Sequence, residues 1–315
     1  MLQRIRDACA RVAERARFVR IAGDAEDYLA TFDGEAVARP SYDVGCHFLG
    51  EPEATVAYVL VLDAINFGSG YFPSLKPAHG AEGYQMLASG LTAWFEAAPP
   101  TAEQLATIAP ERVAEVLGQD LNEPLRAELM RLYAEALREL GGYLSSRFRG
   151  RFAALVTAAS HSAERLAVLL AEMPFFRDVW QYDGLEVPLY KRAQIAASDL
   201  ALALGDVGYG AFHDLDRLTM FADNLVPHVL RCDGVLEYAP ALARRIDAGV
   251  RLAAGSPAEI ELRAVALTVV ERLVAAARHA GAVLRARDLD VALWERGQTA
   301  PYRTRQPHLS LTTAY

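Results

Sequence analysis

The stretch from Leu189 to Asp199 carries a cation and an acid at helical spacing. Lys191, Ile195 and Asp199 lie four residues apart, so a helix would place them on one face, with Ala and Ile between the charges. A charged pair on an apolar helix indicates a buried acid beside a cationic anchor. The same spacing also fits a helix start followed by a distant, solvated aspartate, and both interpretations stay open.

A second acid, Asp223, has apolar neighbours in the segment LDRLTMFADNLVP. Leu218, Phe221, Leu225 and Val226 form a core stripe in this segment when it is read as a helix. Burial would raise the pKa of an unpaired carboxylate, whereas nearby cations or backbone N–H donors would keep it ionised. The segment predicts a functional carboxylate or, as the alternative, an aspartate that caps a neighbouring segment.

Two further stretches place polar groups beside irregular chain. Asp63 and Asn66 lie one turn apart on an apolar helix that breaks at Gly68 into an aromatic loop, a pattern that suits a pocket wall. Arginine presents a planar fork that fits phosphate or carboxylate, and the proline-punctuated tail over 294–315 carries Arg303 and Arg305. A tail that merely wraps the fold is the alternative. The candidate residues of this tail are Tyr302, Arg303, Arg305 and His308.

Several common catalytic signatures are missing from the sequence. There is no GxxxxGK[ST] loop, no HExxH and no GxSxG, and the glycine-rich string over 205–210 follows an expected helix rather than a strand. The seven histidines are dispersed, and isolated ones such as His161 and His228 are more often structural hydrogen-bonding residues than ligands. We therefore expect no metal and no cofactor.

Composition and charge narrow the class of protein. The 315 residues are 52% hydrophobic and 23% charged, which is typical of a globular chain that buries a core. A formal net charge of -8 disfavours a nucleic-acid duplex as partner, because that mode of binding needs a basic face. Three scattered cysteines without CxxC spacing indicate free thiols.

Neither a membrane span nor a signal peptide is expected. The longest apolar run, over 54–62, is far shorter than the ~20 residues that a bilayer requires. The N-terminus has charges throughout and reads as an amphipathic helix. We therefore expect a cytoplasmic protein with no membrane partner.

Helical periodicity recurs from end to end and predicts a mainly α protein. We expect a single compact domain over 1–315 with two lobes around a cleft, and a lobe seam near 147–151. Ser256, Pro257 and Glu259 form a capping box that opens a helix running to about His279. The segment 175–188 should be an ordered loop or short strands. The other helices are expected over 3–19, 54–67, 82–97, 110–117, 123–146, 152–173, 191–204 and 215–230.

Three strings in order, VLDAINF, LYKRAQIAASD and LTMFADNLVP, resemble the queuosine salvage proteins. Members of that family are glycohydrolases that release the base queuine from queuosine 5'-phosphate, and the resemblance extends from about residue 54 to the tail. Asn224 departs from the pattern, since tyrosine follows FAD in many members; this affects one ring contact and not the chemistry. The family fold is similar to the helix-hairpin-helix DNA glycosylases, and Lys191 followed by Asp223 fits their order of lysine and catalytic aspartate.

The resemblance implies a carboxylate beneath the ribose ring. Breaking the bond between C1′ and a base nitrogen builds positive charge on the sugar, which an ionised carboxylate stabilises or attacks, with water as the acceptor. Asp223 is the first choice for this role. Asp199 is the second, either sharing the task or holding the substrate.

The resemblance also implies residues for the base and the phosphate. A 7-deazaguanine leaving group lacks the ring nitrogen that purine hydrolases protonate, so the site must bind the base tightly through its edge. For the base we expect carboxylates, stacked rings and a hydrogen bond, from Asp288, Asp290, Phe221, Tyr71 or Phe72, and His47. For the 5'-phosphate we expect the cations Lys191, Arg192, Arg303 and Arg305.

Two alternatives belong to other classes of protein. One is a non-enzymatic helical protein that binds a modified nucleoside. The other is a glycosylase that acts on DNA or RNA, which the acidic balance disfavours. The sequence leaves open the preference between nucleoside and 5'-phosphate, and the oligomeric state.

Overall fold

Helices dominate the computed structural model, as the periodicity predicts, and the structure describes residues 1–32, 37 and 40–315. The α-helices are α1 (Leu2–Arg15), α2 (Ala25–Leu29), α4 (Pro52–Ile65), α5 (Gly83–Ala97), α6 (Ala102–Ala106), α7 (Pro110–Val116), α8 (Pro124–Phe148), α9 (Phe152–Ala158), α10 (Ala163–Leu170), α11 (Lys191–Leu204), α12 (Leu225–Cys232), α13 (Pro240–Asp247), α14 (Pro257–His279), α15 (Ala286–Gly297) and α16 (Ala300–Arg303). Short 3-10 helices are η1 (Phe72–Ser74), η2 (Pro174–Phe176), η3 (Gly208–Gly210) and η4 (Leu215–Arg217).

Two antiparallel strand pairs complete the described elements. Strand β1 (Val19–Ile21) pairs with β4 (Leu236–Tyr238), so that Val19 lies opposite Tyr238. Strands β2 (Val179–Tyr182) and β3 (Leu185–Pro188) form a hairpin whose turn residues, Asp183 and Gly184, both have positive φ. Short strands over 175–188 are thus confirmed.

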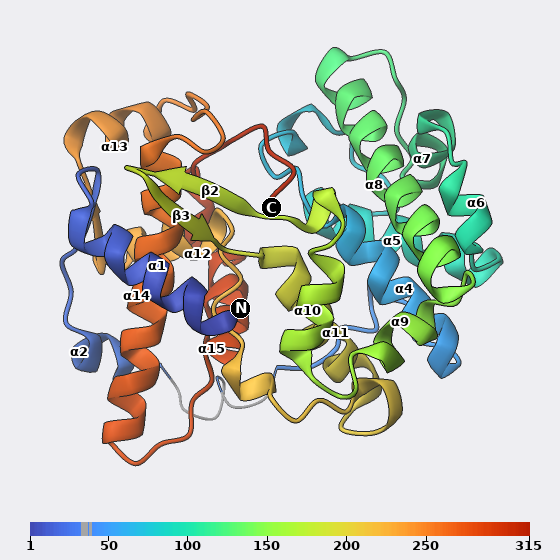
Figure 1. The fold of residues 1–315 in the computed structure, drawn as a ribbon. Coiled ribbons are helices and arrows are strands. Elements are labelled where there is room, and N and C mark those ends of the chain that lie inside the picture. The colour runs from blue at the N-terminus through green and yellow to red at the C-terminus, as the bar shows by residue number, and fades with distance from the viewer. Residues whose placement is uncertain (33–36, 38–39) are drawn as a thin grey trace.

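Two groups of helices lie on either side of α10 and α11 (Figure 1). One group contains α1, α2 and α12 to α15, and the other contains α4 to α9. Helix α11 packs against α4 and α10, and one connected hydrophobic cluster includes Leu62 of α4, Leu200 of α11 and Leu267 of α14. The turn over 147–151, expected as a seam, joins α8 and α9, which both pack against α4 and so lie in the same group.

The C-terminal segment 308–315 is buried between these groups. The backbone N–H of Gly68 donates to the carbonyl of Tyr315, at 2.8 Å, and Leu252 forms a parallel bridge with Ser310. The side chain of Asn224 donates to the carbonyl of His308, at 3.1 Å. Asn224, the residue that departs from the family pattern, therefore fastens this segment to the start of α12.

The expected helix over 215–230 is wrong for its first ten residues. A 3-10 turn, η4, is followed by extended chain, and α12 begins only at Leu225. Proline lacks a backbone N–H and is tolerated in the first turn of a helix but not in its interior, so Pro227 requires a helix start close before it. Asp223 consequently precedes a helix instead of lying within one.

Other helix bounds also differ from expectation. The helix expected over 152–173 is divided, because Ser160 and His161 have positive φ and Ser162 caps α10. The structure also contains helices α2, α6, α13, α15 and α16, which the periodicity does not predict. Helix α14 agrees with its prediction: Ser256 caps it, Pro257 is its first residue and it ends at His279.

Two simpler expectations can be compared with the structure. Within the described residues, no helix has the length and apolar character to span a membrane. Cys9, Cys46 and Cys232 form no disulfide, in agreement with the expected free thiols.

Candidate active site

Four carboxyl groups from three helices and one loop gather around the ammonium group of Lys191; we call this set the acidic centre. Helix α4 supplies Asp63, α11 supplies Lys191 and Asp199, the loop before α12 supplies Asp223, and α15 supplies Asp290. The negative charges of Asp223, Asp63 and Asp290 each favour the protonated form of Lys191. The charges of Asp63 and Asp290 raise the pKa of Asp199, whereas the charge of Lys191 lowers it. The sequence predicted the acid-and-lysine face of α11, and the fold adds acids from separate elements.

Asp223 is anchored by one carboxylate oxygen at the start of α12. Its Oδ1 accepts hydrogen bonds from the backbone N–H groups of Leu225, at 2.9 Å, and Val226, at 3.0 Å. Burial raises the pKa of Asp223, while Lys191 and these two N–H groups oppose that rise. Asp223 therefore caps the neighbouring helix, which was the alternative prediction. This does not exclude a chemical role, because both bonds go to Oδ1 and leave Oδ2 unused.

Asp63 and Asp199 lie on the packed helices α4 and α11, and the charge of Asp63 acts on Asp199. Oδ1 of Asp63 accepts a hydrogen bond from Nδ2 of Asn66 at 3.2 Å, while its buried Oδ2 has no partner among the described residues. Burial raises the pKa of both acids, and the charge of Asp63 raises that of Asp199 further. Both acids are therefore protonated more readily than solvated aspartates. Asp63 was not among the expected site residues, although its spacing with Asn66 had indicated a pocket wall.

Asp290 lies beside Asp223 and is the more deeply buried of the two. Its Oδ1 accepts the backbone N–H of Phe221 at 2.9 Å. Burial, and then the charge of Asp223, raises the pKa of Asp290 well above the usual carboxyl value. Asp290 thus has surroundings that favour its neutral form, next to a carboxyl group that Lys191 and backbone donors favour as the anion.

An aromatic wall adjoins the acidic centre on the side of α5. Nδ1 of His47 donates to the carbonyl of Asp43, and its Nε2 accepts from the hydroxyl of Tyr84, both at 2.9 Å. The ring of Tyr84 meets that of Trp294 edge to face, with centroids 5.7 Å apart. Burial, followed by the charges of Asp199 and Asp63, raises the pKa of Tyr84, which places its hydroxyl near those acids. Neither Tyr84 nor Trp294 was expected as a site residue.

Solvent can reach this centre. Asp199, Asp223, Tyr84 and Trp294 are all only half-buried in spite of their crowded surroundings, whereas Lys191 and Asp290 are buried behind them. The half-buried groups are thus those that a bound molecule would touch first.

Arg192 lies next to Lys191 in sequence but serves the fold. Its guanidinium lies between the rings of Phe67 and Phe176. Its N–H groups are taken up by backbone carbonyls, namely those of Asp63, Ala64, Phe175 and Thr313. A guanidinium engaged in this way has no fork to offer a phosphate, so we remove Arg192 from the candidate phosphate ligands.

The remaining expected residues are not brought into the acidic centre. Arg303 and Arg305 are exposed. The charge of Arg305 favours the ionised forms of Cys232 and Asp247, which lie outside the centre. The hydroxyl of Tyr71 donates to Glu128 at 3.3 Å. Asp288 lies beside Arg287, with 3.2 Å between Nε and Oδ1, and the ring of Phe221 is buried in the core. Sequence spacing could not separate Asp288 from Asp290, which point to different sides of α15.

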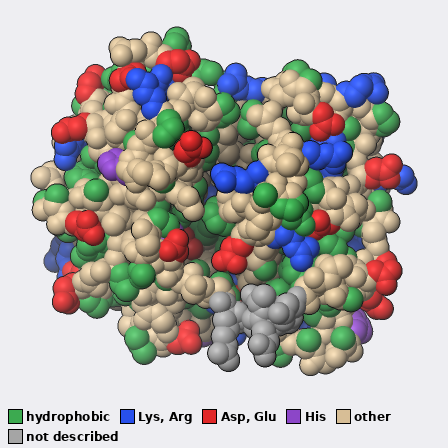
Figure 2. Space-filling view, turned by 180° about the vertical axis from the view of Figure 1, so that it is seen from behind, with side chains coloured by type: hydrophobic (Ala, Val, Ile, Leu, Met, Phe, Trp, Pro, Cys, Tyr) green, Lys and Arg blue, Asp and Glu red, His purple; other side chains and the backbone are tan. Residues whose placement is uncertain are grey.

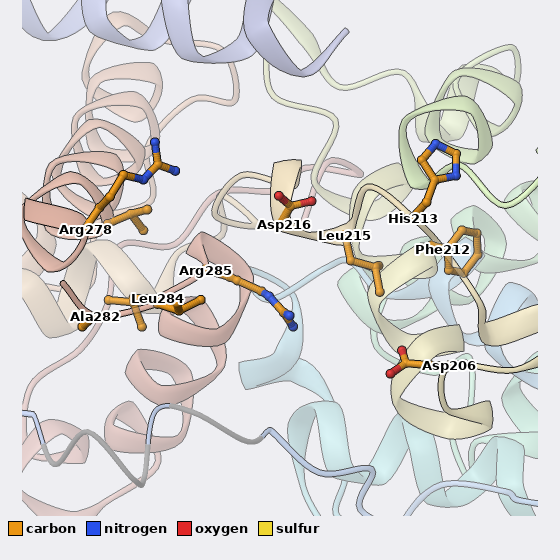
Figure 3. Close-up of a pocket in the computed structure, with 11 residues that line it drawn as sticks. Asp206, Phe212, His213, Leu215, Asp216, Arg278, Ala282, Leu284 and Arg285 are labelled. Carbon is orange, nitrogen blue, oxygen red and sulfur yellow. The ribbon is translucent and has the colours of Figure 1, made fainter.

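A separate cavity of about 500 Å³ opens between the 206–216 segment and the α14–α15 connection (Figure 3). Arg285 extends across it towards the 206–216 segment, and the other ionisable residues around it are Asp206, His213, Asp216 and Arg278. None of the acidic centre residues lines this cavity. Its mixed charges define no ligand class, and we assign it no role.

On the face shown in Figure 2, Lys and Arg are interspersed with Asp and Glu. In the described ranges, His, Cys, Asp and Glu side chains form no group of three arranged to hold a metal ion.

The fold and site define a mainly helical protein with a solvent-reachable, lysine-centred group of carboxyls. A family model described as queuosine salvage protein matches residues 46–315, and the chain belongs to this family. Relatives named queuosine 5'-phosphate N-glycosylase/hydrolase are similar over most of their length. The one from Sphaerobacter thermophilus is 39% identical over 97% of this chain and 95% of its own. Those from Dictyostelium discoideum and Mus musculus are 35% and 28% identical, over 84% and 80% of this chain and 79% and 73% of their own.

Proposed function

We propose that this protein hydrolyses the N-glycosidic bond of queuosine 5'-phosphate and releases queuine. Similarity to relatives that carry this activity in their names supports the substrate. The observation that carries the chemistry is Asp223, whose Oδ1 is fixed by two N–H groups while Oδ2 is available in a half-buried position beside Lys191.

Asp223 acts on the sugar. As the bond from C1′ to the base nitrogen breaks, its electron pair leaves with the base and positive charge builds on the ribose. The carboxylate of Asp223 stabilises that charge, and its fixed position means that little reorganisation is needed during the reaction. Water supplies the oxygen that bonds to C1′, and a proton from that water balances the departing base.

Asp199 and Asp63 act on the same substrate. As a pair that holds one proton, they offer both a hydrogen-bond donor and an acceptor. A carboxylate of the pair also suits a cationic amine, such as the side-chain amine of queuine. Asp199, which is half-buried, makes the contact, and Asp63 behind it sets the protonation state.

The base lies against the aromatic wall. Tyr84 and Trp294 are half-buried and adjoin the acidic centre, which makes them better stacking partners than Phe221 or Tyr71. Neutral Asp290 and the hydrogen bond from Tyr84 to His47 fix the polar edge of this pocket. Of the expected phosphate ligands, Lys191 alone lies in the centre. Because carboxyl groups surround it, its first role is to keep Asp223 ionised.

The test is to incubate purified protein with queuosine 5'-phosphate, and separately with the nucleoside queuosine, and to follow free queuine by chromatography. We expect release from the 5'-phosphate. Thermal stabilisation by the ligand without any product would instead identify a binding protein, and salt-sensitive binding to an oligonucleotide would favour a nucleic-acid glycosylase.

A further inference from the structure

A buried ion pair connects the two parts of the chain that carry Lys191 and Asp223. Arg263, on α14, donates from both terminal nitrogens to Asp178, at 3.1 Å to Oδ1 and 2.5 Å to Oδ2. The side chain of Arg263 is fully buried and that of Asp178 is 4% exposed. A bidentate pair of this kind is directional as well as strong, because a planar fork meets a planar carboxylate.

Asp178 fixes the start of α11. Its Oδ2 accepts the backbone N–H of Lys191 at 3.2 Å, and its carbonyl accepts the N–H groups of Leu189 and Tyr190. Tyr190 has a φ of 49°, a left-handed conformation that is uncommon for a residue other than glycine and that needs support from its surroundings. Asp178 thus determines where the first residue of α11 lies.

Arg263 fixes the backbone next to Asp223. Its Nε donates to the carbonyl of Ala222 at 2.9 Å, and this peptide unit ends at the nitrogen of Asp223. One guanidinium therefore binds Asp178 with its two terminal nitrogens and the carbonyl of Ala222, next to Asp223, with its third. The pair therefore joins α11, α14 and the loop before α12.

We propose that the Asp178–Arg263 pair is the positioning element of the acidic centre, which sets Lys191 and Asp223 in their working geometry. The pair touches no reacting atom and acts through the residues that it holds. This inference rests on the proposed hydrolysis. A buried pair of this kind contributes little net stability compared with apolar residues of similar volume, so a need for geometry explains its presence better than a need for stability.

The first test is Arg263→Lys, which keeps the charge and loses the fork. We expect kcat for queuine release to fall by about 10²-fold, since a misplacement of ~1 Å is enough for such a loss. KM should stay within about threefold of wild type, because the groups that contact substrate are unchanged. The matched control is Arg126→Lys in the pair of Arg126 with Asp120, 2.9 Å apart on the side of α8, which should leave kcat unchanged.

A second variant keeps the test valid if Arg263→Lys folds poorly. In Asp178→Leu with Arg263→Met, apolar residues replace both charges, which buried sites often tolerate without loss of stability. We expect a folded protein with kcat reduced at least as much as in Arg263→Lys.

The pH profile separates positioning from general structural support. The groups that face Asp223 are Lys191 from α11, Arg263 from α14 and Asp290 from α15. The acid limb of kcat should move to higher pH in the apolar double variant, which lacks the Arg263 cation, and stay in place in Arg263→Lys. If wild type releases queuine and either variant has kcat within about twofold of wild type, the inference is overturned. If wild type releases none, the proposed function fails first.

Discussion

Two opposing effects set the pKa of Asp223. Burial favours the neutral acid, while Lys191 and the two N–H groups favour the anion. Since the pKa remains above the ordinary value, protonation should inactivate the enzyme at a higher pH than for a solvated aspartate. The rate of queuine release should therefore fall as pH drops through a pKa above about 4.

Lys191→Met should move that acid limb to still higher pH, because the variant lacks the cation that opposes burial. The measurement is kcat/KM for queuine release as a function of pH. Lys76→Met, at an exposed lysine paired with Asp120, is the control and should leave the limb in place. An acid limb that is the same in wild type and in Lys191→Met would contradict this assignment.

Asp290→Asn should stabilise the protein, and the gain should depend on pH. The pKa of Asp290 is raised in the folded state, so folding favours its neutral form and stability falls as pH rises from the unfolded value towards the folded one. Each pH unit in that window is worth up to ~1.4 kcal/mol, and asparagine does not ionise.

Melting temperatures of wild type and Asp290→Asn between pH 4 and pH 8 test this prediction. We expect the two to be similar near pH 4 and the variant to melt higher at pH 7. A difference that is constant across this range would show that Asp290 is not a buried neutral acid.

At the scale of elements, the contribution of Asp214 to stability depends on pH in the opposite direction from that of Asp290. It accepts bonds at the start of α10 from Ser162 Oγ, at 2.7 Å, and from the backbone N–H groups of Ala163, at 2.6 Å, and Glu164, at 3.2 Å. Burial favours the neutral form, but these donors leave the pKa of Asp214 below its ordinary value. Its contribution to stability is thus present above about pH 4 and is lost as pH falls through the folded pKa.

Asp214→Asn should destabilise the protein by about 1–2 kcal/mol near neutral pH, with a smaller difference from wild type below about pH 4. Thermal unfolding at pH 7 and pH 3.5 measures both values. The exposed neighbour Asp216 gives the control variant Asp216→Asn, for which we expect no more than a small change. A larger loss at pH 3.5 than at pH 7 would be inconsistent with the lowered pKa.

Local sequence signals explain which elements could be predicted. Helix α14 begins with a serine cap and a proline, and its bounds follow from those residues alone. The hydrophobic spacing over 215–230 conceals the loop before α12. Pro227 is the local signal for that loop, because its backbone requires a helix start nearby. The break between α9 and α10 likewise lies at polar residues, Ser160 to Ser162, that a continuous apolar stripe conceals.

At the scale of the whole molecule, Arg192 joins segments that are far apart in the chain. It bonds carbonyls from the end of α4, from η2 and from the C-terminal segment. Arg192→Met should lower the free energy of unfolding by at least about 3 kcal/mol, because several buried carbonyls lose a charged donor. Denaturant unfolding measures this loss.

The control for Arg192→Met is Arg131→Met, which breaks an exposed pair with Glu135 four residues on. Such a pair is worth only about 0.3–0.5 kcal/mol. If the two variants were equally stable, Arg192 would not hold the groups together.

The mainly α class was predictable from periodicity, and the family from three short strings, but the membership of the site was only partly so. Lys191, Asp199 and Asp223 stood out as charges among apolar residues, and the fold brings them together. The rest depends on tertiary packing, which places Asp63 and Tyr84 at the centre. The same packing directs Arg192 to backbone carbonyls inside the protein. The likeness to helix-hairpin-helix glycosylases stays a prediction.

The most direct test of the central claim compares Asp223→Asn with wild type for release of queuine from queuosine 5'-phosphate. Asparagine keeps the bonds to the start of α12 and removes the negative charge, so we expect a folded variant with kcat lowered by about 10²–10³-fold. Asp288→Asn, on the other side of α15, should retain the wild-type rate. A rate for Asp223→Asn within about tenfold of wild type would contradict the assignment of Asp223 as the carboxylate that stabilises the ribosyl cation.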